Sequence, residues 1–342
     1  MYLGIALVAL AGAMSGSGVW PLKAVKVFNF DQIYFFAPLF SFLIIPWTVA
    51  FIFCPDIMDI VARIPRERML LFSVLAVFYT VGCYMGWYTA ARLGVGIAYG
   101  INSCFANITG VMIPILFKGT GQFANSPDFL TLPSNLVMLS VAGMCTAIML
   151  IQNASMVKSA CEKDESISRG RRNFYIFCGF LNGLLGNFAT FVLVYGGSEV
   201  ITLLTDAGQS VFVANIIVWG IVFPMVPVTG MLITGVRMTV HREWKKIIQA
   251  PIEILYVFLA GIQTSVCLGV YATGVILLGS FGGSVGAGFS TSFQIIASQL
   301  LGVLSGEWKH AGTKAIRTMV IALVIVFISI ILLSAGNFLA QN

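Results

Sequence analysis

Charge is scarce in this chain. Of its 342 residues only 9% are Asp, Glu, Lys or Arg, against about 25% in a typical soluble domain. Hydrophobic residues make up 58% of the sequence. A chain with so few charges cannot cover a water-facing surface, so we expect an integral membrane protein with the lipid bilayer as its surroundings.

Residues for metal and nucleotide chemistry are equally few. The two histidines, His241 and His310, lie far apart, and the seven cysteines show no CxxC spacing. No GxxxxGK[ST] motif is present, so ATP is not the expected energy source. We therefore expect no metal, no cofactor and no enzymatic activity.

Long apolar runs dominate what is present. We count ten runs of roughly 20 residues, the length that crosses a hydrocarbon core of about 30 Å as a helix. The predicted spans are Tyr2 to Trp20, Gln32 to Cys54, Met69 to Ala91, Gly94 to Phe117, Ser134 to Asn153, Asn173 to Tyr195, Gln209 to Gly235, Pro251 to Leu278, Gly283 to Ser305 and Ile316 to Leu339.

A polar stretch of residues 154–172 separates five spans from five. Because five crossings reverse the direction of the chain, the second half enters the membrane from the opposite side. The predicted fold is an all-α integral membrane protein with ten transmembrane helices in two inverted five-helix repeats. The repeats cover residues 1–153 and 173–342, and residues 154–172 form a cytoplasmic linker.

Two segments interrupted by glycine, Gly94 to Gly119 and Gly282 to Glu307, superimpose at an offset of about 188 positions. Such corresponding segments line the central cavity in transporters built from repeats. A further run of small residues fits close helix packing in the first span, and it consists of Gly12, Ser15, Gly16 and Gly18. Plain packing is the alternative for every glycine in these helices.

The basic residues predict the orientation. With ten spans, the odd-numbered loops hold fifteen Lys and Arg residues and the even-numbered loops hold four. The side rich in Lys and Arg faces the cytoplasm, which puts both termini outside, although Arg63, Arg66 and Arg68 argue against this. We expect a multi-pass protein of the cell membrane, the inner membrane in a bacterium. The net charge of +6 then reflects orientation, and no nucleic-acid partner is expected.

Four short motifs occur in order along the chain: WPLKAVK at Trp20 to Lys26, IIPW at Ile44 to Trp47, RLGVGIA at Arg92 to Ala98 and GEWKHAG at Gly306 to Gly312. Together they resemble the L-rhamnose–proton symporter family of the drug/metabolite transporter superfamily. The resemblance implies ten helices in two repeats and uptake of a 6-deoxysugar driven by protons. Residues Ser284 to Ser298 are smaller and less aromatic than expected for a rhamnose carrier, which leaves the sugar open.

A sugar presents hydroxyl edges and apolar ring faces, so its site needs polar side chains and aromatic rings. The candidate rings are Tyr84, Trp87, Tyr88 and Tyr99, and their alternative role is packing or an interfacial belt. The candidate amides are Asn102, Asn107, Asn187, Gln263 and Gln294. Hydrogen bonding between helices is the alternative for each amide.

One helical face gives the sharpest site prediction. Small and polar residues recur every fourth position in the ninth span, at Gly286, Ser290, Gln294, Ser298 and Gly302. Positions about 188 earlier are again small or polar, and they include Asn102. We expect Asn102 and Gln294, with Ser290 nearby, to bind substrate hydroxyls near the membrane midplane.

Proton coupling requires a titratable group within the membrane. Glu253 is the one carboxylate inside a predicted span, so we predict it as the proton-linked residue, with an end-of-helix role as the alternative. Glu307 follows the ninth span and is predicted to have a structural or gating role. Lys23 follows Pro21 and is a second gating or structural candidate, with cytoplasmic anchoring as its alternative.

The predicted function is therefore secondary active import of a small sugar, L-rhamnose or a similar deoxysugar, by proton symport. Transport of another small polar solute is the first alternative. An integral membrane enzyme acting on a lipid-linked substrate is the second, but such enzymes show clustered acid–base or metal-binding residues that this chain lacks. The sequence makes no prediction of the oligomeric state.

Overall fold

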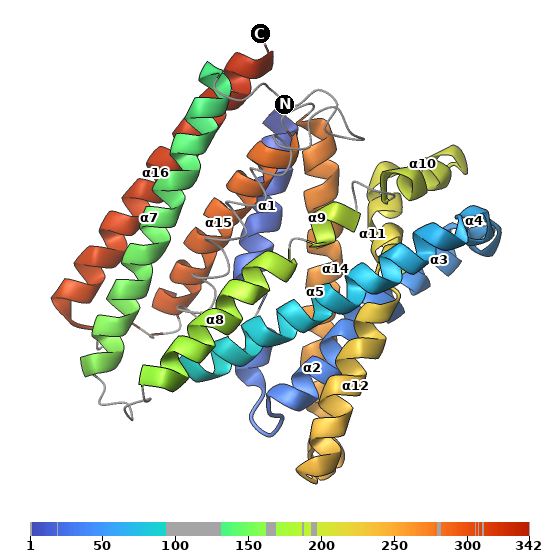
Figure 1. The fold of residues 1–342 in the computed structure, drawn as a ribbon, viewed down its shortest axis with the longest axis horizontal. Coiled ribbons are helices and arrows are strands. Elements are labelled where there is room, and N and C mark those ends of the chain that lie inside the picture. The colour runs from blue at the N-terminus through green and yellow to red at the C-terminus, as the bar shows by residue number, and fades with distance from the viewer. Residues whose placement is uncertain are drawn as a thin grey trace.

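A computed structural model describes residues 2–18, 20–93, 131–161, 169–186, 188–192, 197–278, 282–304, 306, 308–309 and 311–341. Every regular element within these ranges is helical, so the all-α prediction is confirmed for this part of the chain (Figure 1). Tyr2 at the start of α1 and Gln341 at the end of α16 lie at the same end of the molecule.

The elements of the first half are α1 (Tyr2–Ser17), η1 (Pro21–Ala24), α2 (Phe30–Leu39), η2 (Phe40–Ile44), α3 (Ile45–Phe53), α4 (Ile57–Arg63), α5 (Arg66–Leu93) and α7 (Leu132–Cys161). Those of the second half are α8 (Arg169–Gly186), α9 (Phe188–Val192), α10 (Ser198–Asp206), α11 (Val211–Val222), α12 (Met225–Val240), α13 (Lys245–Gln249), α14 (Ile252–Leu277), α15 (Gly282–Leu304) and α16 (Gly312–Gln341). Helices α7 and α8 thus extend into the predicted linker at residues 154–172.

Six helices in the described ranges are long and apolar enough to cross a membrane, or seven if the bent pair α11 and α12 counts as one span. The chain is therefore a multi-pass membrane protein, but fewer than ten spans are seen. Two predicted spans fall on shorter apolar helices, Tyr2–Ser17 and Asn173–Gly186. The 16 residues of α1 rise only about 24 Å, less than the hydrocarbon thickness. The predicted span from Gly94 to Phe117 lies outside the described residues.

Proline shapes the second span of each half. Pro38 lies inside α2 and is followed by the π-helical turn η2, before Pro46 begins the regular turns of α3. Helices α11 and α12 meet at a bend of 51° next to Pro224. Proline lacks the backbone N–H that would continue the helical hydrogen-bond pattern, which explains why these two spans are irregular.

The helices pack in a definite set of neighbours. Helix α1 lies against α14 and α15, α5 against α8, and α2 against α12. Helices α7 and α16 run side by side along one edge of the molecule (Figure 1). The described contacts therefore join elements of the first half to elements of the second in each of these pairs.

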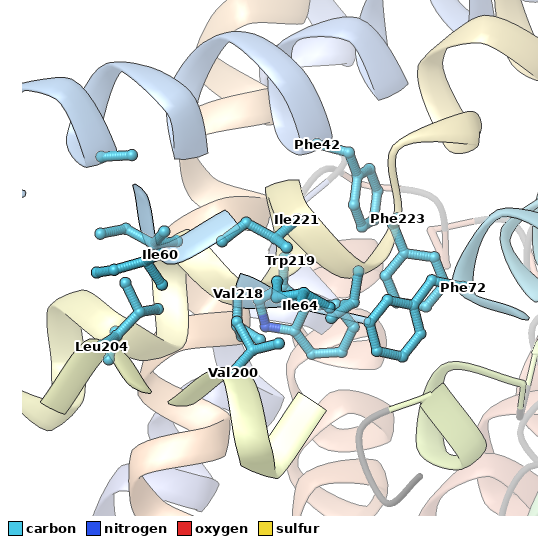
Figure 2. Close-up of a cluster of buried hydrophobic side chains, with 14 of the residues drawn as sticks. Phe42, Ile60, Ile64, Phe72, Val200, Leu204, Val218, Trp219, Ile221 and Phe223 are labelled. Atoms are coloured by element: carbon cyan, nitrogen blue, oxygen red, sulfur yellow. The ribbon is translucent and has the colours of Figure 1, made fainter. Parts of the chain in front are cut away.

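The largest hydrophobic cluster surrounds α11 (Figure 2). Residues 214–222 of this helix are all buried, so α11 is enclosed on every side instead of presenting one face to lipid. The Trp219 ring stacks on Phe223 at a centroid distance of 5.4 Å, and Phe42 and Phe72 pack against the same cluster. This core holds α11 and the first residues of α12 in place, and α12 also packs on α2 and α5.

Candidate functional site

Two glycines hold α1 against the polar face of α15. A Cβ atom added at Gly12 would meet the backbone carbonyl oxygen of Ser290, and one added at Gly16 would meet that of Gln294. Backbone atoms cannot rotate away, so only glycine permits this approach. The predicted small-residue contact in the first span is therefore present. At Ser290 and Gln294 the polar face of α15 lies against a neighbouring helix, which agrees with a packing role.

Gln294 keeps an unbonded amide beside this contact. Its side chain is partly buried and forms no hydrogen bond with another described residue. A partly buried amide without a protein partner is costly inside a membrane, because hydrocarbon offers no hydrogen bonds. Ser290, one turn earlier and also partly buried, lies on the same face. A polar ligand could bond to these two side chains without first breaking a hydrogen bond within the protein.

Gln263, in contrast, is used between helices. Its Nε2 donates to the backbone oxygen of Met14 at 2.7 Å and to Oγ of Ser17 at 3.2 Å. Its Oε1 accepts from the indole N–H of Trp20 at 2.8 Å. These bonds tie α14 to the end of α1, which is the interhelical role that buried amides take in membrane proteins.

Glu253 closes the loop between η1 and α2. Its Oε1 accepts from the backbone N–H groups of Lys26 and Val27 at 2.7 and 2.9 Å. Its Oε2 accepts from those of Val27 and Phe28 at 3.2 and 2.7 Å. Three successive N–H groups thus surround a residue that is 4% exposed, the arrangement of an anion nest. These contacts describe an anchor, and the predicted proton-linked role of Glu253 stays a prediction.

A second buried carboxylate was missed by the sequence analysis. Asp31 on α2 accepts two hydrogen bonds from Nε of Arg237 on α12, at 2.9 Å to Oδ1 and 3.2 Å to Oδ2. The predicted spans excluded both residues by one or two positions at their ends. The available signal was the helix start, because Asn29 and Gln32 have the spacing of a capping box and Oε1 of Gln32 accepts from the Asn29 N–H at 2.8 Å.

Aromatic rings surround this ion pair. The Tyr84 ring lies 5.3 Å from Phe30, 5.5 Å from Tyr34 and 6.4 Å from Tyr88 between centroids. The guanidinium carbon of Arg237 lies 6.0 Å from the centre of the Tyr88 ring, within reach of a cation–π attraction. The predicted ring Tyr84 is therefore brought next to a charged pair. Rings beside charged hydrogen-bonding groups are the combination that sugar sites use.

A further polar link joins the same two helices just beyond the ion pair. Oε1 of Glu243 accepts from Lys246 at 2.9 Å and from Nδ2 of Asn29 at 2.8 Å. Nε2 of Gln32 donates to the backbone oxygen of Glu243 at 3.3 Å. The hydrogen bond from the Lys246 ammonium lowers the pKa of Glu243, so this carboxylate keeps its charge at neutral pH.

Asn215 on α11 is a second amide without a hydrogen-bond partner among the described residues. It is fully buried, and neither Nδ2 nor Oδ1 has a hydrogen-bond partner. The indole N–H of Trp219, one turn later, also lacks a partner. Two buried polar groups without hydrogen-bond partners lower the stability of the fold. Asn215 carries no signal in the sequence, because it lies in the middle of an apolar run with no neighbouring polar residue.

The remaining predicted residues are placed only in part. Trp87 lies on α5 and is partly buried, and Lys23 lies in η1. The other predicted residues lie outside the described residues, and they are Tyr99, Asn102, Asn107, Asn187 and Glu307. Within the described ranges, no group of three or more His, Cys, Asp or Glu residues could hold a metal ion.

No protein-family profile matches the chain. Over 328 residues, 92% of this chain and 92% of the other, the sequence is 19% identical to an L-rhamnose-proton symporter of Mannheimia succiniciproducens strain KCTC 0769BP / MBEL55E. The chain is distantly related to a transporter. By its name, this relative is a transporter.

Proposed function

We propose that this chain is a secondary active transporter that imports a small sugar, L-rhamnose or a similar deoxysugar, by proton symport. The observation that carries the proposal is the similarity to an L-rhamnose-proton symporter across 92% of both chains. A match of such extent covers the helices as a set and not one short motif. The absence of a nucleotide-binding motif in the sequence agrees with a gradient as the energy source.

The helix contacts support two inverted repeats as part of this proposal. A pseudo-two-fold axis that relates the halves repeats every contact between them. If the first span of one half contacts the third span of the other, the converse contact must also be present. Helix α1 packs against α14, and α8 packs against α5. The second spans meet each other through α2 and α12, and the fifth spans through α7 and α16. This pattern is what the symmetry requires.

Transport by such a fold follows from rocking one half against the other around a site near the midplane. Ser290 and Gln294 lie where α15 of the second half meets α1 of the first half. We place the substrate hydroxyls here, with Asn102 as the corresponding residue of the first repeat. In this proposal the odd-numbered loops face the cytoplasm, in the inner membrane of a bacterium.

Uptake into proteoliposomes tests the function. With the purified chain and an inward proton gradient, we expect labelled L-rhamnose to accumulate, and a protonophore should abolish the accumulation because no other energy source is present. A panel of labelled deoxysugars and aldoses identifies the preferred sugar. If accumulation persists with a sodium gradient alone, the coupling ion is sodium and not the proton. If no sugar of the panel shows counterflow, the sugar proposal is refuted in favour of another small polar solute.

Truncation of Gln294 tests the site. In Gln294→Ala we expect the affinity for the transported sugar to fall about tenfold, because one hydrogen bond is worth roughly 1 to 2 kcal/mol here. Binding is measured on detergent-purified protein by titration calorimetry. Gln263→Ala is the matched control, since its amide is bonded to α1 and its loss should lower the thermal stability without changing the affinity. Unchanged affinity in Gln294→Ala would assign this face to packing alone.

A further inference from the structure

The two buried carboxylates of the described chain are held in different ways. Glu253 is bonded to backbone N–H groups of one loop, which stay together as long as that loop keeps its shape. Asp31 depends on one side chain, Arg237, which belongs to another helix. The negative charge of Asp31 is therefore stable only while α2 and α12 stay in contact. A buried carboxylate that loses its cation takes up a proton, because burial disfavours its charged form.

The position of α12 allows such a separation. Helix α12 continues from α11 through the 51° bend beside Pro224, and α11 is enclosed by the cluster in Figure 2. Beyond the bend, α12 packs on α2 of the other half. A hinge next to a fixed helix is the arrangement that lets one end of a span move while the other end stays. Arg237 lies in the last turn of α12, where such a rotation moves a side chain furthest.

The two partners also differ in what they do alone. The Asp31 side chain is 7% exposed, whereas that of Arg237 is 38% exposed and lies over the Tyr88 ring. After separation, Arg237 keeps its charge in contact with water and with an aromatic face. Asp31 has no such support, and wherever its carboxylate remains out of water after the separation, only the neutral form is stable. Separation of the helices and protonation of Asp31 are thus parts of one event.

We propose that Asp31 is the proton-binding residue of this transporter, and that its ion pair with Arg237 links proton binding to the separation of α2 and α12. The inference rests on the proposed function, because it assigns the residue for the proton that symport moves. One proton from one side of the membrane binds an Asp31 carboxylate oxygen as the Arg237 hydrogen bonds break. The same proton leaves to the other side when the pair forms again.

Among the described residues, a second guanidinium lies near the pair, that of Arg92 on α5, whose central carbon is 5.7 Å from the centre of the Tyr88 ring. Tyr84 and Tyr88 approach the pair from α5, and Tyr34 lies on α2 itself with its hydroxyl donating to the backbone oxygen of Thr80 at 3.1 Å. Helix α14 also packs on α2, and its buried carboxylate Glu253 is bonded to the backbone of residues 26–28. Glu243 is bonded to Lys246 and Asn29. Among these groups Asp31 is the carboxylate whose partner can leave.

Neutralising Asp31 gives the first test. In Asp31→Asn we expect counterflow of labelled L-rhamnose to survive while accumulation driven by the proton gradient falls to simple equilibration. The matched control is Asp59→Asn, the same change at an exposed residue of α4, which should accumulate like the parent protein. Full accumulation in Asp31→Asn would overturn the inference, and because the parent protein still accumulates sugar in that case, the proposed function would stand.

Removing the cation gives a second test that keeps the carboxylate. In Arg237→Gln we expect the pH profile of sugar exchange to differ from the parent profile, because the carboxylate loses the cation to which it is bonded. Arg237→Lys keeps the charge and should lie near the parent profile. An unchanged pH profile in Arg237→Gln would overturn the inference even if Asp31→Asn fails to fold.

A third test needs no substrate. A Cβ atom at Gly230 of α12 lies 3.6 Å from Cβ of Pro38 on α2, within the range of about 3.5 to 4.5 Å for a disulfide. We expect the double variant Pro38→Cys, Gly230→Cys to form this disulfide faster with Asp31 than with Asp31→Asn at neutral pH. The ratio of the two rates should fall toward one as the pH is lowered. A lower pH also makes the thiols less reactive, but it does so equally in both proteins, so this effect cancels in the ratio. A ratio that does not change with pH would overturn the inference, whatever the substrate proves to be.

Discussion

Joining α2 to α12 by a disulfide should stop transport. If the two halves rock against each other, the seam between these helices must open in every cycle, since one helix comes from each half. Oxidation of the Pro38→Cys, Gly230→Cys variant is therefore expected to reduce sugar uptake to the level of protein-free liposomes. A reductant should restore it, because the disulfide is the one covalent change.

Three controls accompany this measurement. Each single cysteine variant, treated with the same oxidant, should transport like its reduced form, and the extent of crosslinking is read from mass spectrometry of peptides from both helices. Sugar binding to the oxidised protein should persist, since the proposed site at Ser290 and Gln294 lies at another seam. Uptake that continues in fully crosslinked protein would mean that α2 and α12 stay together throughout transport.

Hydropathy predicted most of the helices in this fold. A run of about 20 apolar residues is a strong signal, because a membrane span must satisfy its backbone hydrogen bonds within one continuous helix. Residues such as Gln32 to Cys54 and Ile316 to Leu339 therefore fall on α2–α3 and α16. Hydropathy is weaker at the ends of a span, where polar residues begin. Asp31 and Arg237 fell at such ends, and an error of two residues hid the ion pair.

Contacts between distant residues could not be predicted from local patterns. Glu253 bonds to backbone groups about 226 positions earlier, and backbone N–H groups carry no sequence signal. Gln263 looked equivalent to Gln294 in the sequence, since both are amides in apolar runs. The structure separates them, because one is bonded to the backbone of Met14 and the other has no described partner.

Replacing Glu253 by Gln should cause the largest loss of stability of any single change considered. Each carboxylate oxygen accepts two backbone hydrogen bonds, and the amide group of Gln has one oxygen and one NH₂. The Val27 N–H is shared by both oxygens, so in either orientation the remaining oxygen keeps two donors and the NH₂ faces one N–H donor, that of Lys26 or Phe28, which is left without an acceptor. With about 1.5 to 3 kcal/mol for a hydrogen bond to a charged group, we expect a loss of about 1.5 to 3 kcal/mol.

The thermal unfolding of Glu253→Gln in detergent, together with its yield of monodisperse protein, measures this loss. Glu243→Gln is the matched control, because its donors Lys246 and Asn29 are side chains that can rotate toward the remaining oxygen, and we expect a loss under about 1 kcal/mol. The same variant separates anchoring from proton transfer. If Glu253→Gln unfolds at the parent temperature and exchanges sugar but no longer accumulates it, then Glu253 carries the proton as the sequence predicts, and the nest of N–H groups around it is not what holds the loop.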